Sequence, residues 1–395
     1  DVAVGLAALL ASFNKFKGLI SGVVFIYAIF AFYAGVNHLY ELIYKGNTNK
    51  NNTGFVLFTD LLVPIVVVLA HLKKKIDIIL LLLVKHITIN KIMSEYQKPF
   101  LKWVGGKSKL LKNIIPNIPL KMNNYHEVFL GGGSMLLAIL TLKKEGKIIV
   151  EGQINAYDLN KSLINCFEWV RNSPLLLVKG VQKLKADFLS IELNTLNQRG
   201  APDVNKNNYK TTREHYYYYI RNKFNRCDKL TMNAAIYFIF LNKTGFRGMY
   251  REDKSGKFNI PYGLKDKKMV PGIINKEEIL AISSLIQEVV FINLDFEKTL
   301  DRVKGGDFIY LDPPYAPESN TSFVGYTGDG FNSEKHNILF EKVKKLKEVK
   351  WIMSNSNVSL VRDSFSDYNI DEIIARRAIN SKNPGATAKE VVIFN

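Results

Sequence analysis

The chain has 395 residues, of which 47% are hydrophobic and 23% are charged, a balance that is ordinary for a folded protein with a large core and roughly two or three domains. The formal net charge of +18 favours a polyanionic partner, nucleic acid first and an anionic membrane second, unless the composition is simply lysine-rich. Only Cys166 and Cys227 are present and the six histidines show no metal-ligand spacing, so the sequence excludes a disulfide framework and a four-cysteine zinc site and indicates no metal.

Residues 1–92 are distinguished by two long apolar stretches, 18–36 and 55–72, the second weakened by Asp60 and Pro64. Lysines precede the first stretch and follow the second, which predicts a membrane hairpin with both ends in the cytoplasm, anchoring a cytoplasmic catalytic domain. Two alternatives stay open: the stretches are buried core helices, or residues 1–92 are an unrelated segment fused ahead of the rest. The chain begins with Asp1 rather than Met, as expected of a processed product or a fragment.

From residue 93 the pattern becomes that of an α/β domain with glycine-rich turns at strand ends. Residues 98–109, KPFLKWVGGKSK, contain a double-glycine turn at which the backbone can approach a ligand closely. Residues 126–134, HEVFLGGGS, predict a strand, a glycine turn and the start of a helix, which places a helix N-terminus beside a cofactor. Residues 147–157 predict the next strand, which ends at Asp158. An acid there can accept hydrogen bonds from ribose hydroxyls, and the alternative is that Asp158 caps the following helix.

Residues 174–269 form a polar, basic and aromatic insert. Residues 242–251, NKTGFRGMYR, and 256–263, GKFNIPYG, interleave cations, aromatic rings and glycine turns. This composition suits phosphate contacts, base-edge contacts and intercalating wedges, and a solvated basic hairpin is the alternative. The tyrosine run at 216–219 is expected to serve the core and surface of a helix rather than to stack on bases.

The stretch 309–315, IYLDPPY, is the central feature of the last third of the chain. Its apolar residues predict a buried parallel strand, and its two prolines end the strand because neither has an N–H to donate to the ladder. In open α/β sheets ligands bind at the carboxyl ends of the strands. The turn offers a carboxylate, exposed carbonyls and an aromatic ring, which suits an exocyclic amine and the ring that bears it. A strand followed by a proline-rich loop is the alternative.

Further elements are expected after this turn. Residues 334–347 predict an amphipathic helix, 351–354 a strand that ends in Asn355, and 390–394 a short last strand. The sequence also predicts a mobile basic loop near the cleft, with Arg376, Arg377, Lys382 and Lys389.

The motifs occur in a fixed order: KWVGGK, then FLGGGS with Asp158, then the basic insert, then LDPPY. In this order they resemble the DNA adenine-N6 methyltransferases of the Dam type, the α class of the D12 family, over about residues 98–395. The resemblance implies a Rossmann-like sheet with an antiparallel last strand that binds S-adenosylmethionine. It also implies a catalytic domain at 93–173 and 270–395 and a mostly helical target-recognition insert at 174–269.

The resemblance assigns roles to individual residues. For catalysis it implies Asp312, Pro313, Pro314 and Tyr315. For cofactor binding it implies Trp103, Lys107, Phe129, Gly131, Gly133, Asp158 and Asp312. For DNA binding it implies Lys102, Phe246, Arg247, Met249, Arg251 and Pro261. It points to GATC as the target, although Phe246-Arg247 stands where relatives commonly have an aromatic residue and Asn.

The function that follows is N6 methylation of adenine in double-stranded DNA. The base has to leave the duplex, after which Asp312 and the Pro313 carbonyl can accept both N6 hydrogens while Tyr315 stacks on the ring. The methyl group then moves by direct in-line attack, with no covalent nucleophile and no metal. RNA adenine, cytosine N4 and a protein glutamine amide are alternative substrates, but the Asp of DPPY and the large basic insert favour adenine in duplex DNA. An alternative of another class is a holin-like membrane protein fused to a DNA-binding or inactive methyltransferase module.

Overall fold

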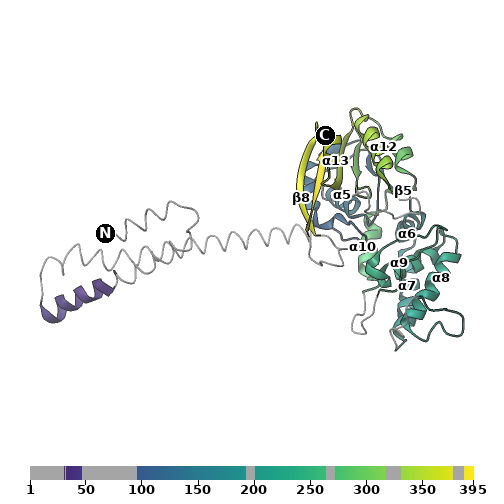
Figure 1. Cartoon of the computed structure of the whole chain (residues 1–395), viewed down its shortest axis with the longest axis horizontal. Coiled ribbons are helices and arrows are strands. Elements are labelled where there is room, and N and C mark those ends of the chain that lie inside the picture. Colours follow the sequence, from purple (N-terminus) through teal and green to yellow (C-terminus); the bar gives the residue numbers. More distant parts are fainter. Residues whose placement is uncertain are drawn as a thin grey trace. The chain divides into compact units, whose positions relative to one another are not determined.

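A computed structural model of the chain describes residues 31, 33–46, 96–192, 201–263, 272–316, 331–376 and 387–395, without the side chains of 375, 376, 387 and 388. The chain divides into two units, Asp1–Lys91 and Ile92–Asn395. In the first unit residues 31 and 33–45 are helical (purple in Figure 1). No helix in the described ranges is long and apolar enough to cross a membrane. The stretches 18–36 and 55–72, on which the expected hairpin depends, lie outside the described residues except at 31 and 33–36.

The second unit is built on a seven-stranded sheet with the order β5-β4-β2-β6-β7-β9-β8. The strands are β2 (Tyr125–Glu127), β4 (Ile154–Asp158), β5 (Val289–Asn293), β6 (Phe308–Leu311), β7 (Lys350–Ser356), β8 (Asn369–Arg376) and β9 (Thr387–Phe394). Neighbouring strands are parallel from β5 to β7, whereas β9 is antiparallel to both β7 and β8. The mostly parallel α/β sheet and its antiparallel last strand are therefore confirmed.

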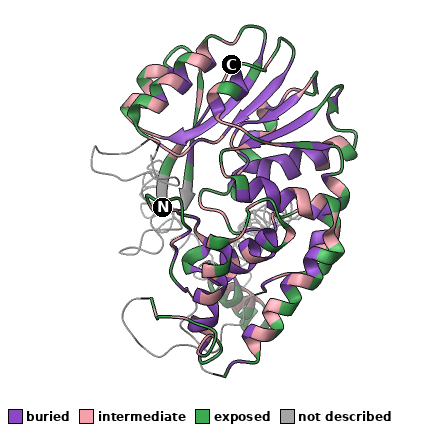
Figure 2. Cartoon of the chain, turned by 90° about the vertical axis from the view of Figure 1, so that its right-hand side faces the viewer, coloured by how far each residue is buried: buried purple, intermediate pink, exposed green. Residues whose placement is uncertain are grey.

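Helices cover both faces of this sheet, because its central strands are apolar on both sides. In β6 the side chains of Phe308 and Tyr310 join one hydrophobic cluster, and those of Ile309 and Leu311 join the other. Figure 2 shows these buried strands among helices whose outer faces are exposed. The helical elements outside the insert are η2 (Lys107–Lys109), α4 (Leu111–Ile114), η3 (Ile115–Asn117), α5 (Ser134–Lys144), α6 (Lys161–Asn172), α10 (Lys276–Leu285), α11 (Phe296–Leu300), α12 (Ser333–Lys344) and α13 (Ser359–Ser364).

The insert is mostly helical, as expected. It contains α7 (Pro174–Leu189), α8 (Arg213–Arg226), α9 (Met232–Thr244) and the short η4 (Phe246–Gly248). Figure 1 shows α7, α8 and α9 gathered beside α6, away from β8 and α13. Of the tyrosine run in α8, Tyr216, Tyr217 and Tyr218 are buried, which confirms that the run serves the helix core.

Two predictions about strands and loops are wrong. The single strand expected at 147–157 is divided into β3 (Ile149–Val150), which pairs with β1 (Lys121–Met122) in a separate small sheet, and β4. The chain bends between them at Gly152, whose amide donates to the Asn123 carbonyl at 2.7 Å. The basic residues expected in one loop are also divided, since Arg376 ends β8 and Lys389 lies in β9. Arg377 and Lys382 lie outside the described residues.

Candidate active site

The candidate site lies at the carboxyl ends of β4, β2 and β6, which are parallel neighbours in the sheet. The glycine turn at 131–133 follows β2, Asp158 ends β4, and Asp312 directly follows β6. The order of the strands along the sheet reverses at β2, and such a switch point is where open α/β sheets bind ligands. Three motifs that are far apart in the sequence therefore meet at one edge of the sheet.

The shortest charged contact in the site joins Asp312 to Lys107. Lys107 Nζ lies 2.7 Å from Asp312 Oδ1, and the two side chains are 4% and 20% exposed. The same ammonium group donates to the Gly105 carbonyl at 2.6 Å, so the double-glycine turn holds it in place. Burial raises the pKa of Asp312 to about 6, and the Lys107 cation acts against that rise. Without this cation, the carboxylate would be a largely buried charge with no nearby opposite charge among the described residues to stabilise it.

Tyr315 is held between Lys107 and the last strand. Its ring centroid lies 4.8 Å from Lys107 Nζ, and its hydroxyl donates to Glu390 Oε2 at 2.7 Å. Glu390 is presented by β9, where it pairs with Ser356 of β7. Burial raises the pKa of Tyr315 well above its ordinary value, so the hydroxyl remains a donor. The Tyr315 ring is therefore held in one orientation.

The end of β7 fixes the backbone just after the motif. The Ala316 amide donates to Asn355 Oδ1 at 3.0 Å, and Ser356 Oγ donates to the Ala316 carbonyl at 2.6 Å. Asn355 is fully buried. The turn therefore leaves the sheet along one defined path.

Trp103 explains why the turn after β2 needs glycine. Gly131 has a φ of +48°, and a Cβ there would lie 2.9 Å from the Trp103 indole. The indole also stacks on Tyr250 of the insert, with ring centroids 6.3 Å apart. Gly133 has a φ of +74° and is the N-cap residue of α5, with no side-chain cap. Trp103 thus packs between the glycine turn and the insert.

Asp158 connects the glycine turn to the end of β4. Its carboxylate accepts hydrogen bonds from the amides of Gly131 at 3.0 Å and Asn160 at 2.8 Å. The next helix, α6, is capped by Asn160, whose Oδ1 accepts from the Leu163 amide at 3.1 Å. The alternative that Asp158 is the helix cap is therefore wrong. A carboxylate has about four acceptor positions, so capacity remains for a ligand.

An aromatic cluster lies beside this edge of the sheet. The ring of Phe129 is 6.0 Å from that of Phe296 and 6.1 Å from that of Phe331. Phe296 opens α11, which is capped by Asp295 through the Glu297 amide at 2.9 Å. No motif singles out Phe296, and its place in this cluster depends on how α11 packs in the fold.

The residues assigned to DNA contact gather around η4. Phe246 is 43% exposed, and its amide donates to the Pro261 carbonyl at 2.9 Å. Arg247 adopts a φ of +55°, which is rare for a residue other than glycine. Arg251 is exposed and donates from Nε to Asn259 Oδ1 at 2.8 Å, whereas Met249 is half-buried against the core.

Lys102 is attached to this group by Asn242, which opens the motif at 242–251 but had no role assigned to it. Asn242 Oδ1 accepts from the Lys102 amide at 2.9 Å, and Asn242 Nδ2 donates to the Lys102 carbonyl at 2.7 Å and the Gly248 carbonyl at 3.1 Å. Asn242 is 4% exposed. This one amide joins the KWVGGK segment to the η4 loop.

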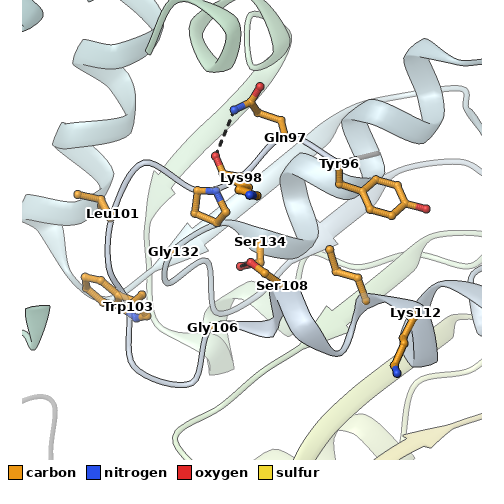
Figure 3. A pocket seen from close by; sticks show the side chains of 12 residues that line it. Tyr96, Gln97, Lys98, Leu101, Trp103, Gly106, Ser108, Lys112, Gly132 and Ser134 are labelled. Atoms are coloured by element: carbon orange, nitrogen blue, oxygen red, sulfur yellow. Dashed lines mark hydrogen bonds between the residues drawn. The ribbon is translucent and has the colours of Figure 1, made fainter. Parts of the chain in front are cut away.

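A cavity of about 330 Å³ borders the KWVGGK segment (Figure 3). It is lined by Tyr96, Gln97, Lys98, Pro99, Leu101, Trp103, Gly106, Ser108, Leu111, Lys112, Gly132 and Ser134. The cavity shares Trp103 and Gly132 with the site described above, but Asp312, Tyr315 and Asp158 are not among its lining residues, so it adjoins the site and does not contain the DPPY turn. Across the described ranges, no group of three or more His, Cys, Asp or Glu residues could hold a metal ion.

The fold is a mostly parallel α/β sheet with the DPPY turn at its switch point, and comparisons with known proteins identify the family as a methyltransferase class. A family model described as D12 class N6 adenine-specific DNA methyltransferase matches residues 103–379. The chain therefore belongs to this class and is an adenine-specific DNA methyltransferase. A model of a family of unknown function, DUF6790, matches residues 1–77.

Curated relatives agree with this membership. Type II methyltransferase M.MjaIII of Methanocaldococcus jannaschii is 34% identical, over 72% of this chain and 93% of that protein. Type II methyltransferase M1.LlaDCHI of Lactococcus lactis subsp. cremoris is 32% identical, over 75% of this chain and 95% of that protein. The DNA adenine methylase of Haemophilus influenzae is 30% identical, over 74% of this chain and 91% of that protein. The alternative of a membrane protein with a DNA-binding or inactive passenger is not favoured.

Proposed function

We propose that the chain transfers a methyl group from S-adenosylmethionine to N6 of an adenine that has left the DNA duplex, with GATC as the target sequence. The observation that carries this proposal is the DPPY turn at the switch point, with the Asp312 carboxylate held by buried Lys107. Such a turn presents fixed acceptors to an amine, and fixed acceptors are what amino methylation requires.

The residues at the edge of the sheet fit the proposed cofactor. Gly133 gives the first turn of α5 no side-chain cap, and although the Leu136 amide bonds to the buried Glu127, the amides before it can receive a carboxylate. Asp158 has acceptor capacity for ribose hydroxyls, and Phe129 and Phe296 offer an apolar surface for a base. Trp103, Gly131 and Gly133 shape the turn around the ligand. When bound, S-adenosylmethionine supplies a methyl group on a positively charged sulfur, which is the electrophile.

Residues of the chain bind and orient the adenine amine. Adenine N6 is inaccessible inside a duplex, so the base is flipped into the site, where Tyr315 stacks on it. The Asp312 carboxylate and the Pro313 carbonyl accept the two N6 hydrogens, which directs the nitrogen lone pair toward the methyl group. Lys107 keeps Asp312 ionised near neutral pH, because its cation opposes the rise in pKa that burial causes. Alignment of the two reactants supplies most of the rate.

The η4 loop supplies the DNA contacts in this proposal. Phe246 is exposed and suited to wedge between bases, and Arg247 and Arg251 carry cations at the same surface. Asn242 holds Lys102 against this loop, so the residues proposed to read the target form one unit with the KWVGGK segment. The chain's net charge of +18 favours association with DNA.

The test is Asp312→Ala, assayed with labelled S-adenosylmethionine and plasmid DNA. The variant is expected to lose methyl transfer, because Asp312 contacts the amine, and to keep binding the cofactor through the glycine turn and Asp158. Mapping N6-methyladenine in wild-type product is expected to find GATC. Turnover retained in the variant would contradict the role of Asp312, and methylation at another sequence would contradict the target.

A further inference from the structure

A buried histidine lies against the backbone of the DPPY turn. His336, in the first turn of α12, is fully buried, and its Nε2 lies 3.0 Å from the Pro314 carbonyl oxygen. Its Nδ1 lies 2.9 Å from the carbonyl oxygen of Asn332, the N-cap residue of the same helix. No motif in the sequence assigns a role to His336. It nevertheless connects α12 to the second proline of the motif.

The turn has few dihedral angles left to adjust. Both proline rings lock φ near −65°. Lys107 holds the side chain of Asp312, and Asn355 holds the amide of Ala316. A hydrogen bond to the Pro314 carbonyl would fix the orientation of the peptide between Pro314 and Tyr315. Contacts on both sides of Pro313 then decide where its carbonyl points.

The Pro313 carbonyl is the group that needs this support. Within the described ranges, no protein hydrogen bond to its oxygen is present, whereas the carbonyls of Pro314 and Ala316 are both engaged. In the proposed function the Pro313 carbonyl accepts one of the two N6 hydrogens. Its direction therefore has to be set by its neighbours.

The surroundings of His336 hold the ring plane but leave the position of the proton open. The ring meets Phe331 edge-on, with centroids 4.7 Å apart, and Phe340 at 5.8 Å. Burial lowers the pKa of His336 below its ordinary value, against the two carbonyl contacts, which raise it. A neutral imidazole donates from one nitrogen only, so it can serve either Pro314 or Asn332, not both.

We propose that His336 is a positioning residue that carries its proton on Nε2, donates to the Pro314 carbonyl, and thereby orients the Pro313 carbonyl toward the amine. This inference rests on the proposed function. The competing assignment places the proton on Nδ1, where it would serve only the first turn of α12.

Two amide substitutions in the full-length chain separate these assignments. The amide nitrogen of Gln reaches the position of Nε2, and that of Asn reaches the position of Nδ1. We expect His336→Gln to keep kcat within about threefold of the wild type and His336→Asn to lose about tenfold or more, because small misplacements of reacting groups are costly. KM for DNA and for S-adenosylmethionine, and the unfolding temperature, are expected to match in the two variants. Turnover is measured with labelled S-adenosylmethionine and plasmid DNA.

Each outcome decides the question. Equal turnover in the two variants, high or low, or faster turnover in the Asn variant overturns the inference. If a difference in kcat is accompanied by unequal KM values or unequal unfolding temperatures, the effect comes from packing, and the inference is overturned as well. If the wild type is active while the variants do not differ as expected, the inference alone fails. An inactive wild type overturns the proposed function and this inference together.

Discussion

The contact between Lys107 and Asp312 makes a quantitative prediction about pH. Lys107→Met keeps the length of the side chain and removes its charge. The ammonium nitrogen lies 2.7 Å from the carboxylate, and the Lys107 side chain is only 4% exposed, so water screens the pair little. An opposite charge at this range lowers the pKa of an Asp by about 1 to 3 units, and each unit is about 1.4 kcal/mol. Its loss should raise the pKa of Asp312 from about 6 by that amount.

The direction of the effect on activity follows from the role proposed for Asp312. A carboxylate accepts hydrogens from the amine only while it is ionised, so activity falls as the pH drops through its pKa. The acidic limb of kcat/KM should lie near pH 6 in the wild type and about 1 to 3 pH units higher in Lys107→Met. The assay is methyl transfer to DNA across the pH range at saturating cofactor, since Lys107 also belongs to the proposed cofactor site.

A nearby lysine provides the matched control for this experiment. Lys109 is exposed in the same short helix, so Lys109→Met should leave the acidic limb where it is in the wild type. Superimposable limbs for the wild type and Lys107→Met would refute the reasoning, because Asp312 would then not depend on Lys107 for its charge.

Two further predictions concern the glycine turn and the N-terminal segment. Gly131→Ala should destabilise the fold more than Gly146→Ala by about 1 to 3 kcal/mol in denaturant unfolding, because both glycines have a positive φ but a Cβ meets the Trp103 indole at Gly131 and nothing within 4 Å at Gly146. Equal losses would show that Trp103 moves aside without cost. We also propose that residues 93–395 fold and act alone, since one unit begins at Ile92 and the D12 match begins at residue 103. Their kcat/KM should stay within about twofold of the full chain, and a tenfold loss would give residues 1–92 a part in catalysis.

The strand that the sequence located well is buried on both faces. The strand expected in the stretch 309–315 agrees with β6, because a parallel strand inside the sheet reads as a short apolar run with an abrupt end. The strand β8 was not predicted. It lies at the edge of the sheet and reads NIDEIIAR, in which charged residues interrupt the apolar ones, so no continuous run marks it. An edge strand of this kind is identified only from its pairing with a neighbouring strand, which here is β9.

In the candidate site too, residues that depend on local sequence could be predicted, and residues that depend on distant contacts could not. Asp312 and the glycine turn could be placed from the sequence because both follow directly from how a strand ends. The roles of the buried partners Asn242 and His336 could not, since Asn242 only opens a motif chosen for its cations and aromatic rings, and His336 is a single polar residue that no spacing separates from an ordinary core residue. Their contacts are with backbone carbonyls of distant loops, at Lys102 and at Pro314, and carbonyls leave no mark on the sequence. The residues that hold a catalytic motif in position therefore have to be sought among buried polar side chains that point at its backbone.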